Sequence, residues 1–585
     1  MDTKMTSGAE NCSSGRLADY KVSVIETLLR SDALKFGEFT LKSKRGSPYF
    51  LNVGDLNSGS ATSVVAEAYA KVIAQNTDTQ STVYIYGIPE KGVALAPTIA
   101  VALAKNGISA KWLFTRKFPK DHGEVKGKSE RERPAALLIT ERDANRILAD
   151  KKIHDASEVF TALEGAQKQG ANLIEAGKGH IAMSDLSKKA DAKPLIVGAI
   201  PPVGIGVWMA DDVFTTGETK IDEVEKLDEL GIVAQSLAIA ADRQEVGIDG
   251  KEAVMEFTKA TGIPVYSILK ATDILQYLKV QAVRQNALAS LTADTGTSAE
   301  SWSLQSPTES PLYFKDGIDW GKQAHRMSAY LKVYGTEEAR TSITFGSSVM
   351  AAHSGRSVIP ACDLSDIAEF EMLVMETSQM DGIGGYKIGF ELALAYGLPE
   401  VVEVARKHTQ KPLIYDHQKA ATDIPDTGKK FMETVKKAGI DAVILFPQSG
   451  PETERAWIYR AYEVGLGVIV GGVMTHPTYQ VSEGGFIENE GAMRMYAIAL
   501  KAGVRDLVVP ATKLDVIAAV KRMAEQEHVN PAFYSPGIGA QGATVEQVNE
   551  MLGNNWHAIV GRDITNAPNK NYGEGAERVI ENLLR

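Results

Sequence analysis

Eight short β-rich runs fill the second half of the chain, and each is separated from the next by a segment long enough for a helix. In order, the runs cover residues 358–364, 385–390, 412–417, 442–447, 467–474, 506–511, 532–537 and 558–561. Short apolar runs that alternate with helix-length segments are typical of parallel strands connected by helices. Eight such units in succession predict a (β/α)8 barrel over about residues 311–585.

Polar side chains occur where several of these predicted strands end. The first three runs carry Asp363, Lys387 and Asp416, and Thr475 and His476 follow the fifth. In a (β/α)8 barrel the C-terminal ends of the strands meet at one face, where active sites are built. We therefore expect these side chains to converge on one pocket.

The third strand candidate ends in a segment that has carboxylates on both sides of one lysine. Its charged residues are Asp416, Lys419 and Asp423. A lysine ammonium held beside a fixed anion can stabilise or protonate a carbanion. A solvated, salt-bridged loop is the alternative interpretation of this segment taken alone.

Glycine-rich turns follow the last two strand candidates. The seventh run leads into residues 535–542, which include Gln541, and the eighth leads into Gly561 and Arg562. Backbone N–H groups in such turns, together with an amide and an arginine fork, are suited to binding a phosphate group. Each turn by itself is better explained as a tight loop, but the two together favour a phosphorylated substrate.

These motifs resemble orotidine 5′-monophosphate (OMP) decarboxylase over about residues 311–585. The resemblance is carried by residues 386–389, 474–477, 536–542 and 559–562 and by the acid-lysine segment. It implies a charged catalytic network made of Lys387, Asp416, Lys419 and Asp423, the last supplied across a dimer interface. It also implies that the ribose, the pyrimidine and the phosphate contact Asp363, Thr475, and the pair Gln541 and Arg562, respectively.

The resemblance also implies a mechanism that needs no metal or organic cofactor. Asp416 lies near the substrate carboxylate, and Lys419 stabilises the charge at the ring carbon and donates the proton that replaces carbon dioxide. The family pattern is Asp-x-Lys-x-x-Asp, whereas here Lys419 follows Asp416 by three positions and precedes Asp423 by four. Residues three apart do not share a strand face unless a bulge or turn intervenes. Lys419 therefore lies beyond the regular strand, or else His417 or Gln418 occupies part of the expected space.

A second acidic strand end lies in the first half of the chain. The apolar run 207–210 leads into an acidic turn and then into a helical segment that begins at Ile221. Acidic residues there can hold ribose hydroxyls and a magnesium-bound diphosphate, while the turn presents N–H groups and hydroxyls to a 5′-phosphate. An unoccupied helix-capping loop is the alternative. The residues of the turn are Asp211, Asp212, Thr215, Thr216, Gly217 and Thr219.

Segments over about residues 17–283 resemble orotate phosphoribosyltransferase. They cover residues 34–43, 47–50, 87–92, 116–123 and 241–245, together with the acidic turn. The resemblance implies a type I phosphoribosyltransferase-like parallel sheet with helices, and contacts to orotate from Lys42, Phe50 and Arg243. It implies contacts to the diphosphate, shared with Mg²⁺, from Lys91, Arg116, Lys117, Lys120 and His122. Of these, Lys120 and His122 sit on a mobile loop that closes over the reacting centre.

The interval from His122 to Asp211 is longer than a lid that simply returns to its strand requires. Apolar residues at 153, 156, 159, 160 and 163 follow helical spacing, which predicts an ordered helical insertion within about residues 125–200. Such an insertion can cap the site, support oligomerisation or contact the barrel.

Composition and the remaining segments limit the other classes of function. Residues 1–16 are expected to form a disordered tail, and the small, polar and proline residues at 284–310 a linker between two domains. A net charge of −11 argues against general nucleic-acid binding, and no apolar stretch is long enough to span a bilayer. Because the chain has only two cysteines and its start lacks a signal-peptide core, we expect a cytoplasmic protein without a disulfide framework or zinc cluster.

The two resemblances complement each other. The first half would join orotate to phosphoribosyl diphosphate (PRPP), and the second would decarboxylate the resulting OMP to UMP. The sequence therefore predicts a bifunctional enzyme of pyrimidine biosynthesis that uses Mg²⁺ in its first half and forms a homodimer or higher homo-oligomer. Two alternatives remain open, namely a related phosphosugar decarboxylase or aldolase in the barrel, and a catalytically silent nucleotide-binding regulator in the first half.

Overall fold

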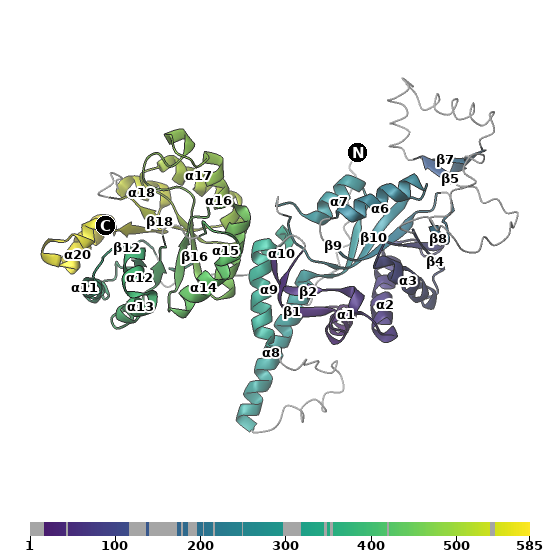
Figure 1. Cartoon of the computed structure of the whole chain (residues 1–585), viewed down its shortest axis with the longest axis horizontal. Coiled ribbons are helices and arrows are strands. Elements are labelled where there is room, and N and C mark those ends of the chain that lie inside the picture. The colour runs from purple at the N-terminus through teal and green to yellow at the C-terminus, as the bar shows by residue number, and fades with distance from the viewer. Residues whose placement is uncertain are drawn as a thin grey trace, which may run out of the picture. The chain divides into compact units, whose positions relative to one another are not determined.

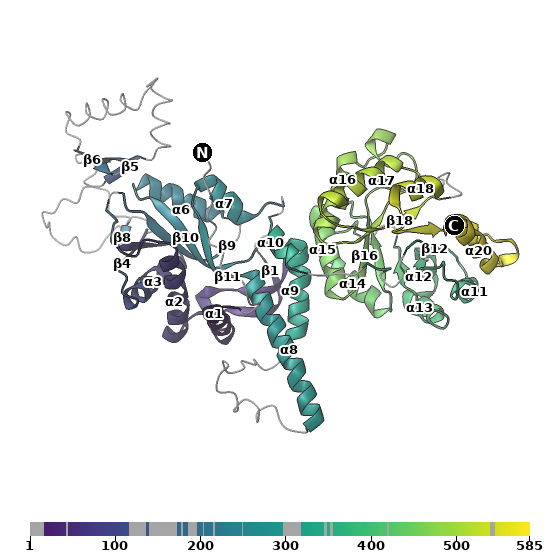
Figure 2. The ribbon, with the colours of Figure 1, turned by 180° about the vertical axis from the view of Figure 1, so that it is seen from behind.

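The chain divides into two compact units, Met1–Ala324 and His325–Arg585. The computed structural model (Figures 1 and 2) describes residues 17–41, 45–115, 136–139, 172–176, 180–184, 196–202, 204–214, 217–247, 250–295, 318–343, 348–350, 355–417, 421–538 and 545–584. The division falls within one helix, α9 (Trp320–Tyr334). Helix α8 (Ala271–Thr295) extends through the first part of the segment that the sequence predicts as a linker. The predicted tail and the rest of that linker lie outside the described residues.

The first unit is built on a six-stranded sheet with the order β11-β10-β9-β3-β4-β8. Every neighbouring pair is parallel except β4 with β8. This confirms the expected parallel sheet and adds one antiparallel edge strand. The strands are β3 (Val83–Gly87), β4 (Ala110–Thr115), β8 (Ile196–Gly198), β9 (Val207–Phe214), β10 (Ala234–Asp242) and β11 (Val265–Lys270).

Helices cover both faces of this sheet (Figures 1 and 2). On one face lie α1 (Asp19–Arg30), α2 (Gly59–Gln75) and α3 (Gly92–Lys105), and on the other lie α6 (Glu218–Glu229) and α7 (Ala253–Thr261). The central strand β9 is buried along its whole length, as expected of a parallel strand covered on two sides. The strand order reverses between β3 and β9, and open parallel sheets bind their ligands at such a reversal.

Two smaller sheets complete the described part of the first unit. One is the antiparallel pair of β1 (Leu34–Thr40) and β2 (Gly46–Leu51), and the short helix η1 (Val53–Asp55) follows it. The other has the order β5-β7-β6 and consists of β5 (Ala136–Ile139), β6 (Asn172–Ala176) and β7 (His180–Ser184). The described strands of the insertion are therefore β5, β6 and β7 in this sheet and β8 at the edge of the six-stranded sheet. The predicted helical segment at 153–163 lies outside the described residues.

Two glycines allow β3 and α3 to pack against β9. A Cβ atom added at Gly92 would lie 2.1 Å from the backbone oxygen of Ala210, and one added at Gly87 would lie 2.4 Å from the backbone oxygen of Gly92. The N–H of Ile88 donates to the same Ala210 oxygen at 3.0 Å. These contacts fix the turn that carries Lys91 relative to the middle of β9.

The substitution Gly92→Ala is expected to destabilise the first unit by roughly 2–3 kcal/mol, because the new methyl group meets backbone atoms that cannot move aside. Urea unfolding of the two proteins measures the loss. Gly59→Ala is the matched control, since nothing lies within 4 Å of the added Cβ at this helix start. Equal stability of Gly92→Ala and Gly59→Ala would contradict the expectation.

The second unit is a closed barrel of eight parallel strands. All eight predicted strands are confirmed in their predicted order, although each ends one to three residues before its predicted run does. The strands are β12 (Ser357–Cys362), β13 (Tyr386–Ile388), β14 (Leu413–Tyr415), β15 (Ala442–Leu445), β16 (Gly467–Gly471), β17 (Asp506–Val508), β18 (Ala532–Pro536) and β19 (Trp556–Val560).

Helices follow these strands around the outside of the barrel (Figure 1). The segment before the first strand contains α10 (Glu337–Thr341). The others are α11 (Ile367–Thr377), α12 (Phe390–Tyr396), α13 (Leu398–Arg406), α14 (Thr427–Lys437), α15 (Pro451–Glu463), η3 (Val481–Glu483), α16 (Asn489–Lys501), α17 (Leu514–Gln526), α18 (Val545–Leu552), α19 (Arg562–Thr565), η4 (Pro568–Lys570) and α20 (Tyr572–Leu584).

Alternate residues of the strands fill the barrel interior. Ile359, Ile414 and Ile444 belong to one buried cluster there. Because successive side chains of a strand point to opposite faces, the next inward positions after Ile414 and Ile444 are Asp416 and Phe446. The interior packing thus brings these two residues to the C-terminal mouth of the barrel.

The opposite end of the barrel contains a buried carboxyl group. Asp506 is only 2% exposed and accepts hydrogen bonds from the hydroxyls of Ser348 at 2.6 Å and Tyr534 at 2.8 Å, and from the N–H of Val349 at 3.1 Å. Desolvation raises the pKa of Asp506 to about 6, although these hydrogen bonds and Arg505 oppose the shift. Ionisation of Asp506 in the folded barrel therefore lowers the free energy of unfolding.

The substitution Asp506→Asn should remove a pH dependence of barrel stability. An unfolded aspartate has a pKa of about 4, so the stability linked to the raised pKa is fully present below about pH 4 and is lost as the pH rises through about 6. Between these limits the free energy of unfolding of the wild type should fall by roughly 3 kcal/mol relative to that of the variant. The amide oxygen of the variant still accepts hydrogen bonds. Urea unfolding at several pH values measures the difference, and a constant difference would contradict the expectation.

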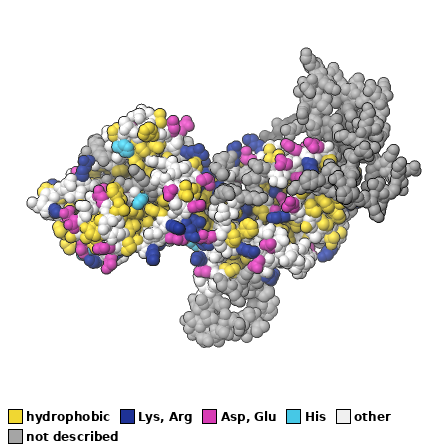
Figure 3. Space-filling view, viewed as in Figure 1, with side chains coloured by type: hydrophobic (Ala, Val, Ile, Leu, Met, Phe, Trp, Pro, Cys, Tyr) yellow, Lys and Arg dark blue, Asp and Glu magenta, His cyan; other side chains and the backbone are white. Residues whose placement is uncertain are grey.

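Charged side chains of both signs are interspersed on the visible face of the molecule (Figure 3). Such mixing weakens the long-range attraction that a nucleic acid would need. Among the helices of the described ranges, none is both long and apolar enough to cross a membrane.

Candidate active sites

A cavity of about 460 Å³ lies at the C-terminal mouth of the barrel. Strand ends and the turns that follow them supply its lining, as the barrel fold requires. Asp363, Lys387, Asp416, Thr475 and Arg562 are among the positions predicted from the sequence that come together there. His476 also lines the cavity, and its ring packs edge-on against Tyr479.

Lys387 lies between two carboxylates in this cavity. Its Nζ atom is 3.2 Å from Oδ1 of Asp363 and 3.1 Å from Oδ2 of Asp416. The Lys387 side chain is 7% exposed, whereas that of Asp363 is 44% exposed and open to a ligand. Desolvation acts to lower the pKa of Lys387, but the charges and hydrogen bonds of Asp416 and Asp363 outweigh it and raise this pKa. The ammonium is therefore charged at neutral pH and fixes both carboxylates.

The strand alternation continues past the end of β14. Asp416 points into the cavity, whereas His417 turns outward, with Nδ1 2.6 Å from the hydroxyl of Tyr415 and its ring against Phe431. His417 therefore does not fill the space expected for the catalytic lysine. Lys419 and Gln418 lie outside the described residues, so the position of Lys419 stays a prediction.

Asp423 is exposed and does not line the cavity of its own chain. Its backbone oxygen accepts a hydrogen bond from the Thr453 hydroxyl at 2.9 Å, and the Trp457 Nε1–H donates to the backbone oxygen of Ile424 at 3.2 Å. Helix α15 thus holds the backbone of this loop. The contribution of Asp423 to a neighbouring subunit's site stays a prediction.

The phosphate end of the cavity is formed by the turns after β18 and β19. Gly537, Ile538 and Gly561 line it, and the exposed Arg562 begins α19. Gln541 lies outside the described residues. The turn backbones and the guanidinium suit an anionic ligand group.

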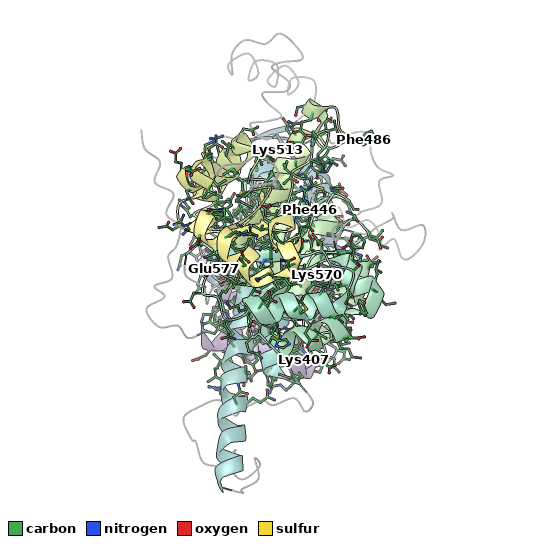
Figure 4. All side chains as sticks on the ribbon, turned by 90° about the vertical axis from the view of Figure 1, so that its left-hand side faces the viewer. Lys407, Phe446, Phe486, Lys513, Lys570 and Glu577 are labelled. Atoms are coloured by element: carbon green, nitrogen blue, oxygen red, sulfur yellow. The ribbon has the colours of Figure 1, made fainter. Side chains whose placement is uncertain are left out.

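Phe446 and Asn566 are two of the cavity residues that were not identified from the sequence. Phe446 follows the inward-facing Ile444 by two positions, so strand alternation was the signal for it. Asn566 follows the four-residue helix α19, which no sequence pattern predicted. Figure 4 shows Phe446 near the middle of the barrel unit, whereas Lys407 lies toward its lower margin.

In the first unit, Asp211 and Asp212 lie where the strand order reverses. Gly87, the last residue of β3, pairs with Ala210, so both aspartates extend past the end of β3. The expectation that the strand ends at Ala210 is wrong, because β10 continues to pair with β9 as far as Phe214. The predicted helix also begins earlier, since α6 starts at Glu218.

The two aspartates face different helices, as successive residues of a strand must. Oδ2 of Asp211 is 2.7 Å from Nζ of Lys220 in α6, and Oδ2 of Asp212 is 2.5 Å from Nζ of Lys91 at the start of α3. Burial raises the pKa of Asp211, and the Lys220 ammonium opposes this shift. Lys220 was not identified from the sequence, where no motif marked it.

The described residues of the turn after β9 lie at the start of α6. Gly217 adopts a left-handed conformation with φ of 84° directly before α6, and the exposed Thr219 is in the first turn. A residue with a side chain would be strained at Gly217. Seven further residues predicted for this site lie outside the described ranges. They are Lys42, Arg116, Lys117, Lys120, His122, Thr215 and Thr216.

The residues predicted to bind orotate are only partly brought together. The buried Arg243 donates to the hydroxyl of Ser47 at 2.9 Å and to Glu245 at 2.8 Å, and its guanidinium lies over the Tyr49 ring. Phe50 instead stacks on Phe39, because it points to the opposite face of β2. The structure therefore fixes Arg243 against β2 but leaves Phe50 as a partly exposed side chain.

The carboxylates at the strand reversal are the candidate magnesium ligands of the first unit. Within the described ranges, no group of three or more His, Cys, Asp and Glu side chains is arranged to hold a metal ion. Asp211 and Asp212 each already pair with a lysine. This donor set fits a magnesium ion held chiefly by the oxygens of a bound diphosphate.

Both units have similar proteins of known class. Residues 356–574 match the model of the orotidine 5′-phosphate decarboxylase / HUMPS family. The chain is 31% identical over 261 residues to the orotate phosphoribosyltransferase of Marinobacter nauticus, covering 45% of this chain and 89% of that protein. It is also 31% identical over 272 residues to the orotate phosphoribosyltransferase of Acinetobacter baumannii, covering 46% and 91%.

Two solved structures are also similar to parts of the chain. The orotate phosphoribosyltransferase of Francisella tularensis is 25% identical with a TM-score of 0.29, covering 44% of this chain and 90% of that one. The OMP decarboxylase of Methanocaldococcus jannaschii, complexed with the inhibitor BMP, is 26% identical with a TM-score of 0.34, covering 40% and 100%.

The acidic strand reversal of the sheet and the charged mouth of the barrel define two enzyme units in one chain. Through its first unit the chain belongs to the orotate phosphoribosyltransferase family, and its barrel carries the match to the OMP decarboxylase family. Both resemblances seen in the sequence are thereby confirmed.

Proposed function

We propose that this chain is a bifunctional UMP synthase-like enzyme. It converts orotate and PRPP into OMP and diphosphate, and then converts OMP into UMP and carbon dioxide. The observation that carries the proposal is that one chain joins a unit of the orotate phosphoribosyltransferase family to a barrel with the Asp363, Lys387 and Asp416 network in its cavity. The product of the first reaction is the substrate of the second.

In the first unit, the strand reversal binds PRPP. Asp211 and Asp212 accept hydrogen bonds from the ribose hydroxyls, and the turn through Gly217 receives the 5′-phosphate at the start of α6. Lys91 leaves Asp212 for the diphosphate, whose developing charge it neutralises together with Arg116, Lys117, Lys120 and His122. A magnesium ion held with the diphosphate would supply further charge neutralisation. Orotate is held by Arg243, Lys42 and Phe50.

In the barrel, the phosphate end anchors OMP so that its carboxylate meets Asp416. Arg562, Gln541 and the glycine turns bind the phosphate, Asp363 the ribose and Thr475 the pyrimidine. Lys387 holds Asp416 in place. As the bond to the carboxylate breaks, its electron pair remains on the ring carbon, where Lys419 stabilises the charge and donates a proton. Decarboxylation of this kind requires the barrier to fall by roughly 20 kcal/mol, most of it from preorganised charges.

The proposal includes a homodimer or higher homo-oligomer. Its support is that Asp423 is exposed and lies outside the cavity of its own chain, so a role in decarboxylation requires a second subunit. The enzyme acts in the cytoplasm, as the sequence predicts. The few cysteines of the chain suit a reducing compartment.

The decisive experiment incubates the purified chain with orotate, PRPP and Mg²⁺ and follows orotate loss and UMP formation. Formation of UMP supports both assignments. The absence of OMP and UMP would overturn the assignment of the first unit, and OMP that accumulates without UMP would overturn that of the barrel. In a second assay with supplied OMP, near-normal activity of Lys419→Ala would show that Lys419 is not the proton donor.

A further inference from the structure

The two adjacent aspartates of the first unit have different surroundings. Lys91, the partner of Asp212, has a side chain that is 47% exposed. Lys220, the partner of Asp211, has a side chain that is only 6% exposed. The first pair can exchange partners with a ligand at low cost, whereas the second pair is enclosed by protein.

Three contacts fix the Lys220 ammonium. Its Nζ atom is 2.7 Å from Oδ2 of Asp211, donates to the backbone oxygen of Val213 at 3.0 Å and lies over the ring of Phe214 at 5.2 Å from its centre. The backbone oxygen of Asp211 accepts a hydrogen bond from the Tyr69 hydroxyl at 2.5 Å. Both the backbone and the side chain of Asp211 are therefore fixed.

Stability alone does not account for an enclosed ion pair. Desolvation of both charges offsets most of their attraction, so apolar residues of similar size commonly stabilise a fold as well. What the pair does supply is one orientation of a charged carboxylate at the strand reversal. Burial disfavours that charge, and the lysine beside it counteracts the effect.

We propose that Lys220 is a positioning residue for phosphoribosyl transfer, which holds the Asp211 carboxylate in the orientation that accepts the ribose hydroxyls of PRPP. This inference rests on the proposed function of the first unit. Lys220 acts through Asp211 and does not touch the substrate. Asp212 differs, because it exchanges Lys91 for the substrate.

The test uses the full chain with Lys220→Met, Lys220→Arg, Asp211→Asn and the double variant Asp211→Asn with Lys220→Met. Lys220→Met should raise KM for PRPP at least about tenfold, because Asp211 loses its fixed orientation. Lys220→Arg should restore most of the affinity. In the double variant, Lys220→Met should add less than about twofold to the effect of Asp211→Asn, since the lysine acts through that carboxylate.

The controls separate positioning from folding. Lys226 lies on the same helix and pairs with Glu223 at 3.3 Å, away from Asp211. Lys226→Met should therefore leave the KM for PRPP unchanged. The double variant leaves no unpaired buried charge, so it remains informative if Lys220→Met folds poorly. A fall in kcat with unchanged KM, or fully additive effects in the double variant, would overturn the inference. A wild-type chain that forms no OMP would overturn the proposed function instead.

Discussion

Lys387→Ala should lower kcat/KM for OMP decarboxylation at least about 10³-fold, while phosphoribosyl transfer by the same chain stays unchanged. The ammonium lies within 3.2 Å of Asp363 and 3.1 Å of Asp416. Its removal leaves two carboxylates in one cavity without their shared counter-charge. Neither carboxylate then keeps the orientation that the ribose and the reacting carboxylate require.

The two activities measured on one preparation provide the internal control for this variant. Lys407→Ala is the matched lysine control, since Lys407 is half exposed, pairs with Glu371 at 3.4 Å and lies away from the cavity residue Phe446 (Figure 4). It should keep full decarboxylase activity. A loss smaller than about tenfold in Lys387→Ala would show that the Lys387 network does not take part in decarboxylation.

Asp212→Asn should reduce OMP formation about 10²- to 10³-fold and leave decarboxylation of supplied OMP unchanged. The carboxylate of Asp212 lies past the end of β3 and 2.5 Å from Lys91. The amide keeps one acceptor oxygen but loses the negative charge beside a ribose carbon that becomes cation-like during transfer. Initial rates of orotate consumption at several PRPP concentrations measure the effect.

Asp222→Asn is the matched control for this prediction. Asp222 is exposed on α6, in the helix that follows the acidic turn. Its substitution should leave both activities unchanged. If Asp212→Asn retained wild-type transfer rates, the assignment of Asp212 to the substrate would be wrong.

Strand positions were predictable because the physics that sets them is local. Buried parallel strands need short apolar runs, and helices between them need long amphipathic ones, so all eight barrel strands could be located from periodicity. The same alternation explains why Lys387 and Asp416 meet. It would also have revealed Phe446, two positions after Ile444.

Tertiary contacts were not predictable from such patterns. Two successive aspartates predict the start of a turn. Strand β9 nevertheless extends through Asp211 and Asp212, because β10 continues to pair with it. Lys220 was missed for the same reason, because its partner is fixed by how α6 packs on the sheet. Alternation along the strand turns His417 outward, but its contact with Phe431 depends on how the next helix packs.

The hydrogen bonds from α15 to the loop after β14 bear on how this barrel can be recombined. The loop belongs to the third strand-helix unit, whereas Thr453 and Trp457, which hold the backbone oxygens of Asp423 and Ile424, belong to the fourth. A chimera that joined the first three units to the remainder of a relative would lose both anchors unless these two side chains came with it. The third and fourth units therefore form a single block for exchange between barrels.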